Sequence, residues 1–197
     1  MKQKEFSQII RFDGKNVFME VMNNAFPIGK VQINFIEYGN DHKQIKKIDL
    51  FMDISKALLL CNDILTGKLC ALAKIAKEKQ INENSKYCKE IFTDLGGISA
   101  ANLAKKGKTR PDGKSLSRQL KITPGAKQPW IFSGETGAGE ENETGLIVPK
   151  GIPEEIVRVP LNDEQLKQFA LIIQMHLTSF TTYQYMMQSK EDGKQAQ

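Results

Sequence analysis

Residues 31–65 read VQINFIEYGNDHKQIKKIDLFMDISKALLLCNDIL and contain two strand patterns, the turn between them and the start of a helix. Apolar and polar residues largely alternate from Lys30 to Tyr38 and from Gln44 to Met52, on either side of a Gly39-Asn40-Asp41 turn. This pattern predicts a β-hairpin. Asp53 then precedes apolar residues at helical spacing, as a helix N-cap does. Antiparallel strands followed by a helix predict an α+β fold.

Two further strands precede this hairpin. The segments Phe6 to Phe12 and Asn16 to Met22 also alternate, and Asp13-Gly14 and Pro27-Ile28-Gly29 supply the turns. The helix that follows Asp53 is expected to pause at Gly67 and to resume through Lys79. The first part of the chain therefore predicts a four-stranded meander closed by a helix.

The second part of the chain has the same order. Strands are predicted at Tyr87 to Leu95, Ile98 to Ala104, Leu116 to Thr123, Trp130 to Ser133, Thr144 to Pro149 and Glu155 to Leu161. Asn162 or Asp163 is expected to cap a long helix. Its apolar stripe consists of Leu166, Phe169, Ala170, Ile173, Leu177 and Phe180.

The predicted fold class is thus α+β, with two antiparallel β-meanders each followed by a helix. The two halves, residues 1–80 and 81–188, are expected to pack as one unit, and residues 189–197 to form a disordered tail. The shared order indicates an internal repeat. Chance similarity between two strand-to-helix junctions is the alternative explanation.

Composition narrows the class of protein. The chain has 197 residues, a formal net charge of +5 and three cysteines without CxxC spacing, which favours reduced thiols over a zinc site or a disulfide framework. The first twelve residues lack the apolar core of a signal peptide. No segment reaches the roughly 20 apolar residues of a membrane span. These features predict a cytoplasmic protein without a membrane partner.

Positive charge is concentrated in one segment. Between Gly96 and Pro129 only Asp112 is acidic, whereas the basic residues are Lys105, Lys106, Lys108, Arg110, Lys114, Arg118, Lys121 and Lys127. Pro111-Asp112-Gly113 predicts a turn, so the first five of these basic residues are expected on a hairpin tip that can hold phosphates, with Arg118 and Lys121 on the strand that follows. Because lysine meets phosphate as a point charge, binding to the backbone is favoured over reading of bases. A solvated lysine-rich loop is the alternative.

Aromatic residues follow this basic segment. Trp130 and Phe132, spaced by two, are expected to project from one strand face beside Arg118 and Lys121. Aromatic faces beside basic residues form single-strand binding surfaces, where stacking contributes about 1–3 kcal/mol per base. A second polar face is expected in the first half at Lys30, Gln32 and Tyr38. A tryptophan in the core and an ordinary half-solvated sheet are the alternatives.

At the level of layout, this sequence resembles the Whirly and positive-cofactor-four type of single-stranded DNA-binding proteins. Lys106-Gly107-Lys108 is similar to the start of the Whirly KGKAAL motif, and Thr109-Arg110-Pro111 departs from the rest of it. No signature residue carries over. The resemblance implies that nucleic acid lies across the sheet surfaces and that oligomers form through the helices.

Motifs of enzymes are missing from this sequence. Only His42 and His176 are present as histidines, and GxSxG, HExxH and DxD-type clusters do not occur. The acidic glycine-rich run from Gly134 to Gly145 matches neither a dinucleotide fingerprint nor a P-loop, and predicts a flexible hairpin loop or a guard over a basic groove. A non-enzymatic protein without metal or other cofactor is expected.

The preferred functional hypothesis is a sequence-tolerant protein that binds single-stranded DNA or RNA, with DNA favoured over RNA, in replication, repair or a mobile element. It is expected to be a homo-oligomer, with the interface on one flank of the last helix at Ile172, Met175, Tyr183 and Met186. Packing of that flank on the first-half helix is the alternative. The rival function is a protein-interaction or structural module that uses the C-terminal helix.

Overall fold

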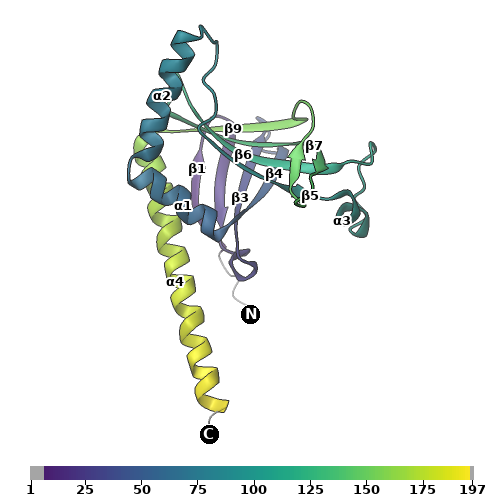
Figure 1. Cartoon of the computed structure of the whole chain (residues 1–197), viewed down its shortest axis with the longest axis vertical. Helices are drawn as coiled ribbons and strands as arrows, with labels where there is room; N and C mark the ends of the chain where they lie inside the picture. The colour runs from purple at the N-terminus through teal and green to yellow at the C-terminus, as the bar shows by residue number, and fades with distance from the viewer. Residues whose placement is uncertain (1–6, 196–197) are drawn as a thin grey trace.

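Two antiparallel sheets, each followed by helix, make up the chain in a computed structural model that describes residues 7–195 (Figure 1). The first sheet contains β1 (Gln8–Asp13), β2 (Val17–Met22), β3 (Lys30–Tyr38) and β4 (Gln44–Asp53) in that order. A short 3-10 helix, Phe26–Ile28, joins β2 to β3. The predicted α+β class and its meander of hairpins are confirmed. Phe6, predicted to begin the first strand, lies outside the described residues.

Helices α1 (Ile54–Leu65) and α2 (Lys68–Asn82) follow the first sheet. They are separated at Gly67, whose φ of 80° is left-handed and favours glycine. The predicted pause is therefore confirmed. Asp53 occupies the N-cap position, but its side chain makes no capping hydrogen bond and instead accepts one from Lys30 Nζ.

The second sheet is built around β7 (Trp130–Glu141). On one side, β6 (Ser115–Pro124) pairs with β7, and β5 (Phe92–Ile98) forms the edge beyond β6. On the other side, β7 pairs first with β9 (Glu155–Leu161) and then with β8 (Ile147–Pro149). Helix α4 (Asp163–Gln195) begins directly after β9 with reciprocal hydrogen bonds between Asn162 and Gln165. This is a capping box, so Asn162 is the cap.

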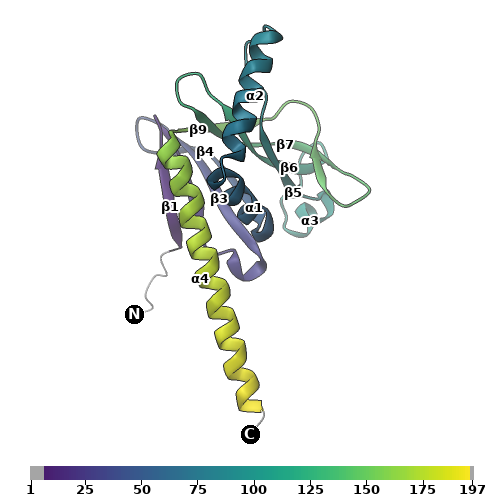
Figure 2. The same cartoon turned by 60° about the vertical axis from the view of Figure 1, so that its left-hand side comes forward.

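The core lies where the two sheets cross and where α1 and the first half of α4 cover them (Figures 1 and 2). The Phe169 ring of α4 lies 5.2 Å from the Phe132 ring of the second sheet and 6.5 Å from the Phe12 ring of the first. The predicted stripe is buried from Leu166 to Leu177, and Phe180 packs at its margin. One core therefore joins both halves.

Of the two strands predicted before β6, one is wrong and the other begins later than predicted. The segment predicted as a strand at Ile98 to Ala104 is mostly helix α3 (Ala100–Lys105), because Ser99 Oγ accepts a hydrogen bond from Asn102 N and alanine, leucine and lysine favour helix. The strand predicted from Tyr87 begins only at Phe92. Residues 83–91 instead form the connection from α2 to β5.

The glycine-rich run also differs from the prediction of a flexible loop. Gly134, Gly137 and Gly139 belong to β7 and are buried. A Cβ on Gly134 would lie 2.6 Å from Cδ2 of Phe35, and one on Gly139 would lie 2.7 Å from Ile147. The glycines are therefore places where other side chains pack directly on the strand, as glycine within a strand often indicates.

Helix α4 continues past Ser189, where the sequence predicts a disordered tail, to Gln195. Extending an existing helix costs far less than starting one, so polar residues can continue it. The last part of α4 extends well beyond both sheets (Figure 1). Among residues 7–195 no helix is both long and apolar enough to span a bilayer.

Candidate nucleic-acid interface

The outer face of the second sheet carries polar residues in register. Lys121 on β6 pairs with Ser133 on β7, and Ser133 pairs with Arg158 on β9, so the three side chains form a row across the sheet. In the next row, Gln119 pairs with Glu135. Because side chains alternate along a strand, the neighbouring residues of β6 and β7 face the core. The side chains of this face are polar, and α2 lies beside it.

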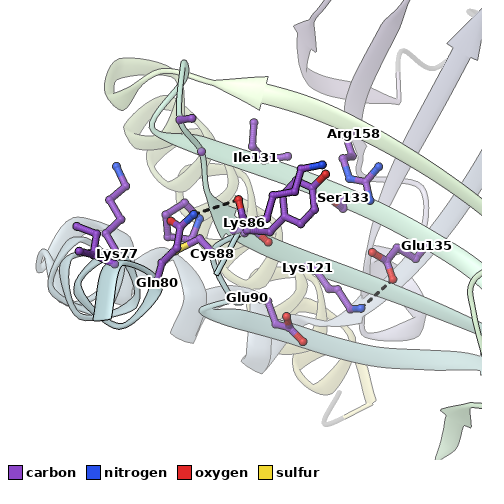
Figure 3. Close-up of a pocket in the computed structure, with 16 residues that line it drawn as sticks. Lys77, Gln80, Lys86, Cys88, Glu90, Lys121, Ile131, Ser133, Glu135 and Arg158 are labelled. Atoms are coloured by element: carbon purple, nitrogen blue, oxygen red, sulfur yellow. Dashed lines mark hydrogen bonds and ion pairs between the residues drawn. The ribbon is translucent and has the colours of Figure 1, made fainter. Parts of the chain in front are cut away.

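A groove of about 930 Å³ lies over these rows (Figure 3). The sheet forms its floor, and the end of α2 with the following connection forms its wall. Its lining comprises Lys77, Gln80, Ile81, Lys86, Tyr87, Cys88, Glu90, Lys121, Thr123, Pro124, Gly125, Ala126, Ile131, Ser133, Glu135 and Arg158.

Hydrogen bonds to the backbone hold the wall in place. Gln80 Nε2 donates to the carbonyl oxygens of Ser85 and Lys86, each at 3.2 Å, and Ser85 Oγ donates to the carbonyl of Tyr87 at 3.0 Å. The Tyr87 side chain is left 71% exposed. Lys86 Nζ lies 5.2 Å from the centre of its ring, within reach of a cation–π interaction. The wall thus presents an aromatic face and a cation together.

Cationic side chains outnumber carboxylates in this groove. Lys77, Lys86, Lys121 and Arg158 line it together with Glu90 and Glu135. Lys121 Nζ lies 2.8 Å from Glu135 Oε2, an ion pair at the groove floor. A recessed surface with an excess of positive charge attracts an anionic chain.

The basic segment between Gly96 and Pro129 is divided among several locations. Lys105, Lys106 and Lys108 are exposed at the end of α3 and just after it, and none of them forms an ion pair with any described residue. Lys114 is half-buried at the start of the next strand. The predicted turn forms, with Gly113 N donating to Arg110 O. This cluster lies at the opposite end of β6 from the groove.

Arg110 has a different role from its neighbours. Its guanidinium donates to both carboxylate oxygens of Asp112 and to both of Glu154, clamping the turn to the segment before β9. These bonds raise the pKa of Arg110, lower the pKa of Asp112 to about 2 and lower that of Glu154. Arg110 is therefore already occupied by carboxylates. The prediction that it is an open phosphate contact is wrong in this structure.

Arg118 lies on the inner side of the second sheet. Burial lowers the pKa of its guanidinium, and attraction by Asp49 of the first sheet opposes that shift. Its position follows from the alternation of β6, which places it on the same face as Leu120 and Ile122. Of the predicted cations on this strand, only Lys121 lines the groove.

Trp130 and Phe132 are core residues, so the prediction that they form an exposed stacking surface is wrong. Their exposed fractions are 3% and 0%. Trp130 Nε1 donates to Asp163 Oδ1 at 2.7 Å, which satisfies the buried indole. Spacing by two correctly places both rings on one face, but that face is the inner one. Ile131, between them, lines the groove.

The predicted polar face of the first sheet exists, but its groups are largely engaged with one another. Lys30 pairs with Asp53, and Gln32 Nε2 donates to Asn34 Oδ1 at 2.7 Å. Tyr38 lies half-buried between the rings of Phe18 and His42, with centroid separations of 6.1 and 6.3 Å. This face is remote in sequence from the groove and carries both signs of charge.

The predicted interface flank of α4 is partly used inside the chain. Ile172 is half-buried, and α4 packs against α1, as the monomeric alternative requires. Met175, Tyr183 and Met186 remain 55%, 61% and 58% exposed. Self-association through these three residues stays a prediction.

Sequence reasoning missed the groove wall. Tyr87 was assigned to a strand, and Lys77, Lys86 and Arg158 were not selected as candidates. The Lys86-Tyr87 dipeptide next to a polar stretch was an available signal, because a cation beside an aromatic is typical of single-strand binding sites.

Among the described residues no group of three or more His, Cys, Asp and Glu side chains could hold a metal ion.

The structure thus combines two crossed antiparallel sheets with a groove on the second sheet in which cationic side chains outnumber carboxylates. No protein-family model matches the chain, and no curated protein matches it in sequence. A solved structure with a similar fold is that of the plant transcriptional regulator PBF-2. The TM-score is 0.54 at 10% identity, over 95% of this chain and 89% of that one. This similarity concerns the fold alone, and it supports the expected layout of repeated antiparallel sheet and helix.

Proposed function

We propose that the protein binds nucleic acid without catalysis, that it prefers single strands, and that the strand lies in the groove of the second sheet. The observation that carries this proposal is the exposed Tyr87 ring beside Lys86, in a groove that Lys121 and Arg158 also line. Cations along a groove track the phosphates, and an exposed aromatic offers a stacking surface to a base. The fold similarity to a transcriptional regulator is consistent with a nucleic-acid partner.

Preference for single strands follows from the chemistry of Tyr87. A base within a duplex already stacks on its neighbours, so only an unpaired base presents a free face to a wall aromatic. The lysines of α3 add a sequence-independent attraction for phosphates. We favour DNA over RNA as the strand, in replication, in repair or in a mobile element.

The test is fluorescence anisotropy with labelled single- and double-stranded oligonucleotides across a salt series. Single strands are expected to bind more tightly, and log affinity is expected to fall linearly with log salt because counterions are released. Tyr87→Ala should weaken single-strand binding roughly 5- to 150-fold, the equivalent of about 1–3 kcal/mol for one stacked base. Tyr185→Ala is the matched control, because Tyr185 is 68% exposed but lies on α4.

Tighter binding to duplex, or no binding at low salt, would refute the proposal. If Tyr87→Ala and Tyr185→Ala weaken binding equally, the groove is not the site where the strand binds.

A second candidate function is a protein-interaction module. The observation that favours it is the exposed end of α4, where Tyr183, Tyr185 and Met186 are all more than half exposed. Co-purification separates the two candidates: an elevated ratio of absorbance at 260 to 280 nm, lost after a high-salt wash, favours nucleic acid.

A further inference from the structure

We infer that the floor of the groove is a base-selective pocket that prefers guanine, an inference that rests on the proposed binding of a strand in this groove. Glu135 carries the argument. Its side chain is only 8% exposed although it lines a groove of about 930 Å³. A carboxylate that is recessed at the base of a groove can be reached only by a narrow or flat group.

Glu135 is incompletely satisfied within the protein. Lys121 Nζ lies 2.8 Å from Oε2 as an ion pair, and Oε2 is shut off from solvent and accepts no hydrogen bond from the described residues. Buried carboxylate oxygens normally accept hydrogen bonds. An entering group with N–H donors would supply them.

The floor presents acceptors and a donor side by side. The Glu135 carboxylate offers two acceptor oxygens, and the adjacent Lys121 ammonium offers N–H donors (Figure 3). The Watson–Crick edge of guanine has the complementary order, with O6 as an acceptor followed by the N1–H and N2–H donors. Guanine could bond to both carboxylate oxygens once Lys121, which is paired with Oε2, turns away from that oxygen and donates to O6.

The other bases match this arrangement less well. Adenine and cytosine each offer one amino group to the carboxylate and leave its second oxygen without a donor. Thymine offers one N–H flanked by two carbonyl oxygens, one of which would face a carboxylate oxygen and be repelled. Enzymes and binding proteins that accept unstacked bases read the same edge by hydrogen bonds while an aromatic side chain stacks on the ring. Tyr87 on the wall is placed to stack.

The surroundings fit a nucleotide within a strand. Arg158 is the register neighbour of Ser133, in the same row as Lys121, and is exposed at the groove. Lys86 lies on the wall next to Tyr87. These cations of the wall and the floor can hold the phosphates that flank the selected base. The expected sequence tolerance would then hold for the strand as a whole, with one position that discriminates.

The experiment uses short oligothymidines that differ only in one central nucleotide, dG, dA, dC or dT, measured by anisotropy at fixed salt. The wild-type protein is expected to bind the dG strand about tenfold more tightly than the dT strand, within the range for a bidentate base contact. Glu135→Gln, which keeps the shape but replaces one acceptor with a donor, should abolish this preference while binding of the dT strand persists.

Glu140→Gln is the matched control. Glu140 lies on the same strand, pairs with Lys150 and is half-exposed outside the groove lining, so this variant should keep the preference. The order of the wild-type protein's affinities for the four strands tests the inference without any substitution. Equal affinity for all four would overturn the guanine pocket and leave the proposed function standing, whereas failure of every strand to bind would refute the proposed function itself.

Free guanine nucleotide is the other source of the same chemistry. Titration with GMP by calorimetry separates the two, because a strand also engages the surrounding cations. Weaker binding of GMP than of the dG strand supports a guanine within a strand. Binding of GMP as tight as that of the strand would overturn the assignment to a strand.

Discussion

Replacing Gly134 by alanine tests whether the glycine-rich run is a packed strand, as the structure has it, or a flexible loop. The added Cβ would lie 2.6 Å from Cδ2 and 2.8 Å from Cγ of Phe35. Carbon atoms in contact are normally about 3.5–4.0 Å apart, so roughly 1 Å of space must open. Phe35 has no exposed surface and lies at the crossing of the two sheets, so its ring cannot move into solvent.

The expected cost is about 2–3 kcal/mol, near the upper end for overpacking of a core. For a chain of this size it corresponds to a fall of about 4–12 °C in the melting temperature. Urea unfolding followed by circular dichroism measures both. Gly96→Ala is the control, because a Cβ there would meet only Arg118 O at 3.8 Å.

Shortening the opposing side chain provides an internal check. In a Phe35→Leu background the added methyl group should cost less than in the wild type, since the two residues are in direct contact and their effects should not add. If the free energies of unfolding of Gly134→Ala and Gly96→Ala differ by less than about 0.5 kcal/mol, the packing described for β7 is wrong and the glycine-rich run behaves as a loop.

Three other predictions concern the surface, a thiol and the last helix. Replacing Lys105, Lys106 and Lys108 together by alanine should weaken the binding of all strands and reduce the slope of log affinity against log salt by about 2. The melting temperature should stay nearly unchanged, because exposed charges contribute little to folding. Intact affinity would contradict a role for these lysines. Burial raises the pKa of Cys61 to about 12, so at pH 8 its side chain stays a thiol. Cys61 should therefore resist alkylation in the folded protein, while the exposed Cys70 reacts. Equal alkylation rates of the two cysteines, measured by mass spectrometry, would refute this. Light scattering should find a dimer or larger species that Ile172→Glu with Tyr183→Glu dissociates, and a wild-type monomer at micromolar concentration would contradict self-association through α4.

Strand order was predictable because alternation and turn residues are local signals. β3 and β9 have the predicted bounds, and the break at Gly67 and the buried stripe of α4 also follow from spacing. These features depend on residues near one another in the chain. Their hydrophobic periodicity can be recognised in the sequence without knowing which element each of them packs against.

The errors arise where a distant partner decides the outcome. Gly134 resembles a loop glycine until Phe35 of the other sheet packs on it, and nothing near position 134 in the sequence indicates that contact. Trp130 was expected on an outward face because period two says which residues share a face but not which face is inward. Arg110 was counted as a phosphate contact because its pairing with Glu154, far along the chain, has no local signal.

The hydrogen bond between Trp130 and Asp163 has a consequence for spectroscopy. Trp130 is the chain's sole tryptophan, it is 3% exposed, and its indole is held by a carboxylate in the first turn of α4. Its emission therefore reports how firmly that helix is seated, and should shift to the red if the first turn detaches and water reaches the ring. A ligand in the groove lies on the opposite face of the strand, so a quenching titration could remain silent while binding is complete.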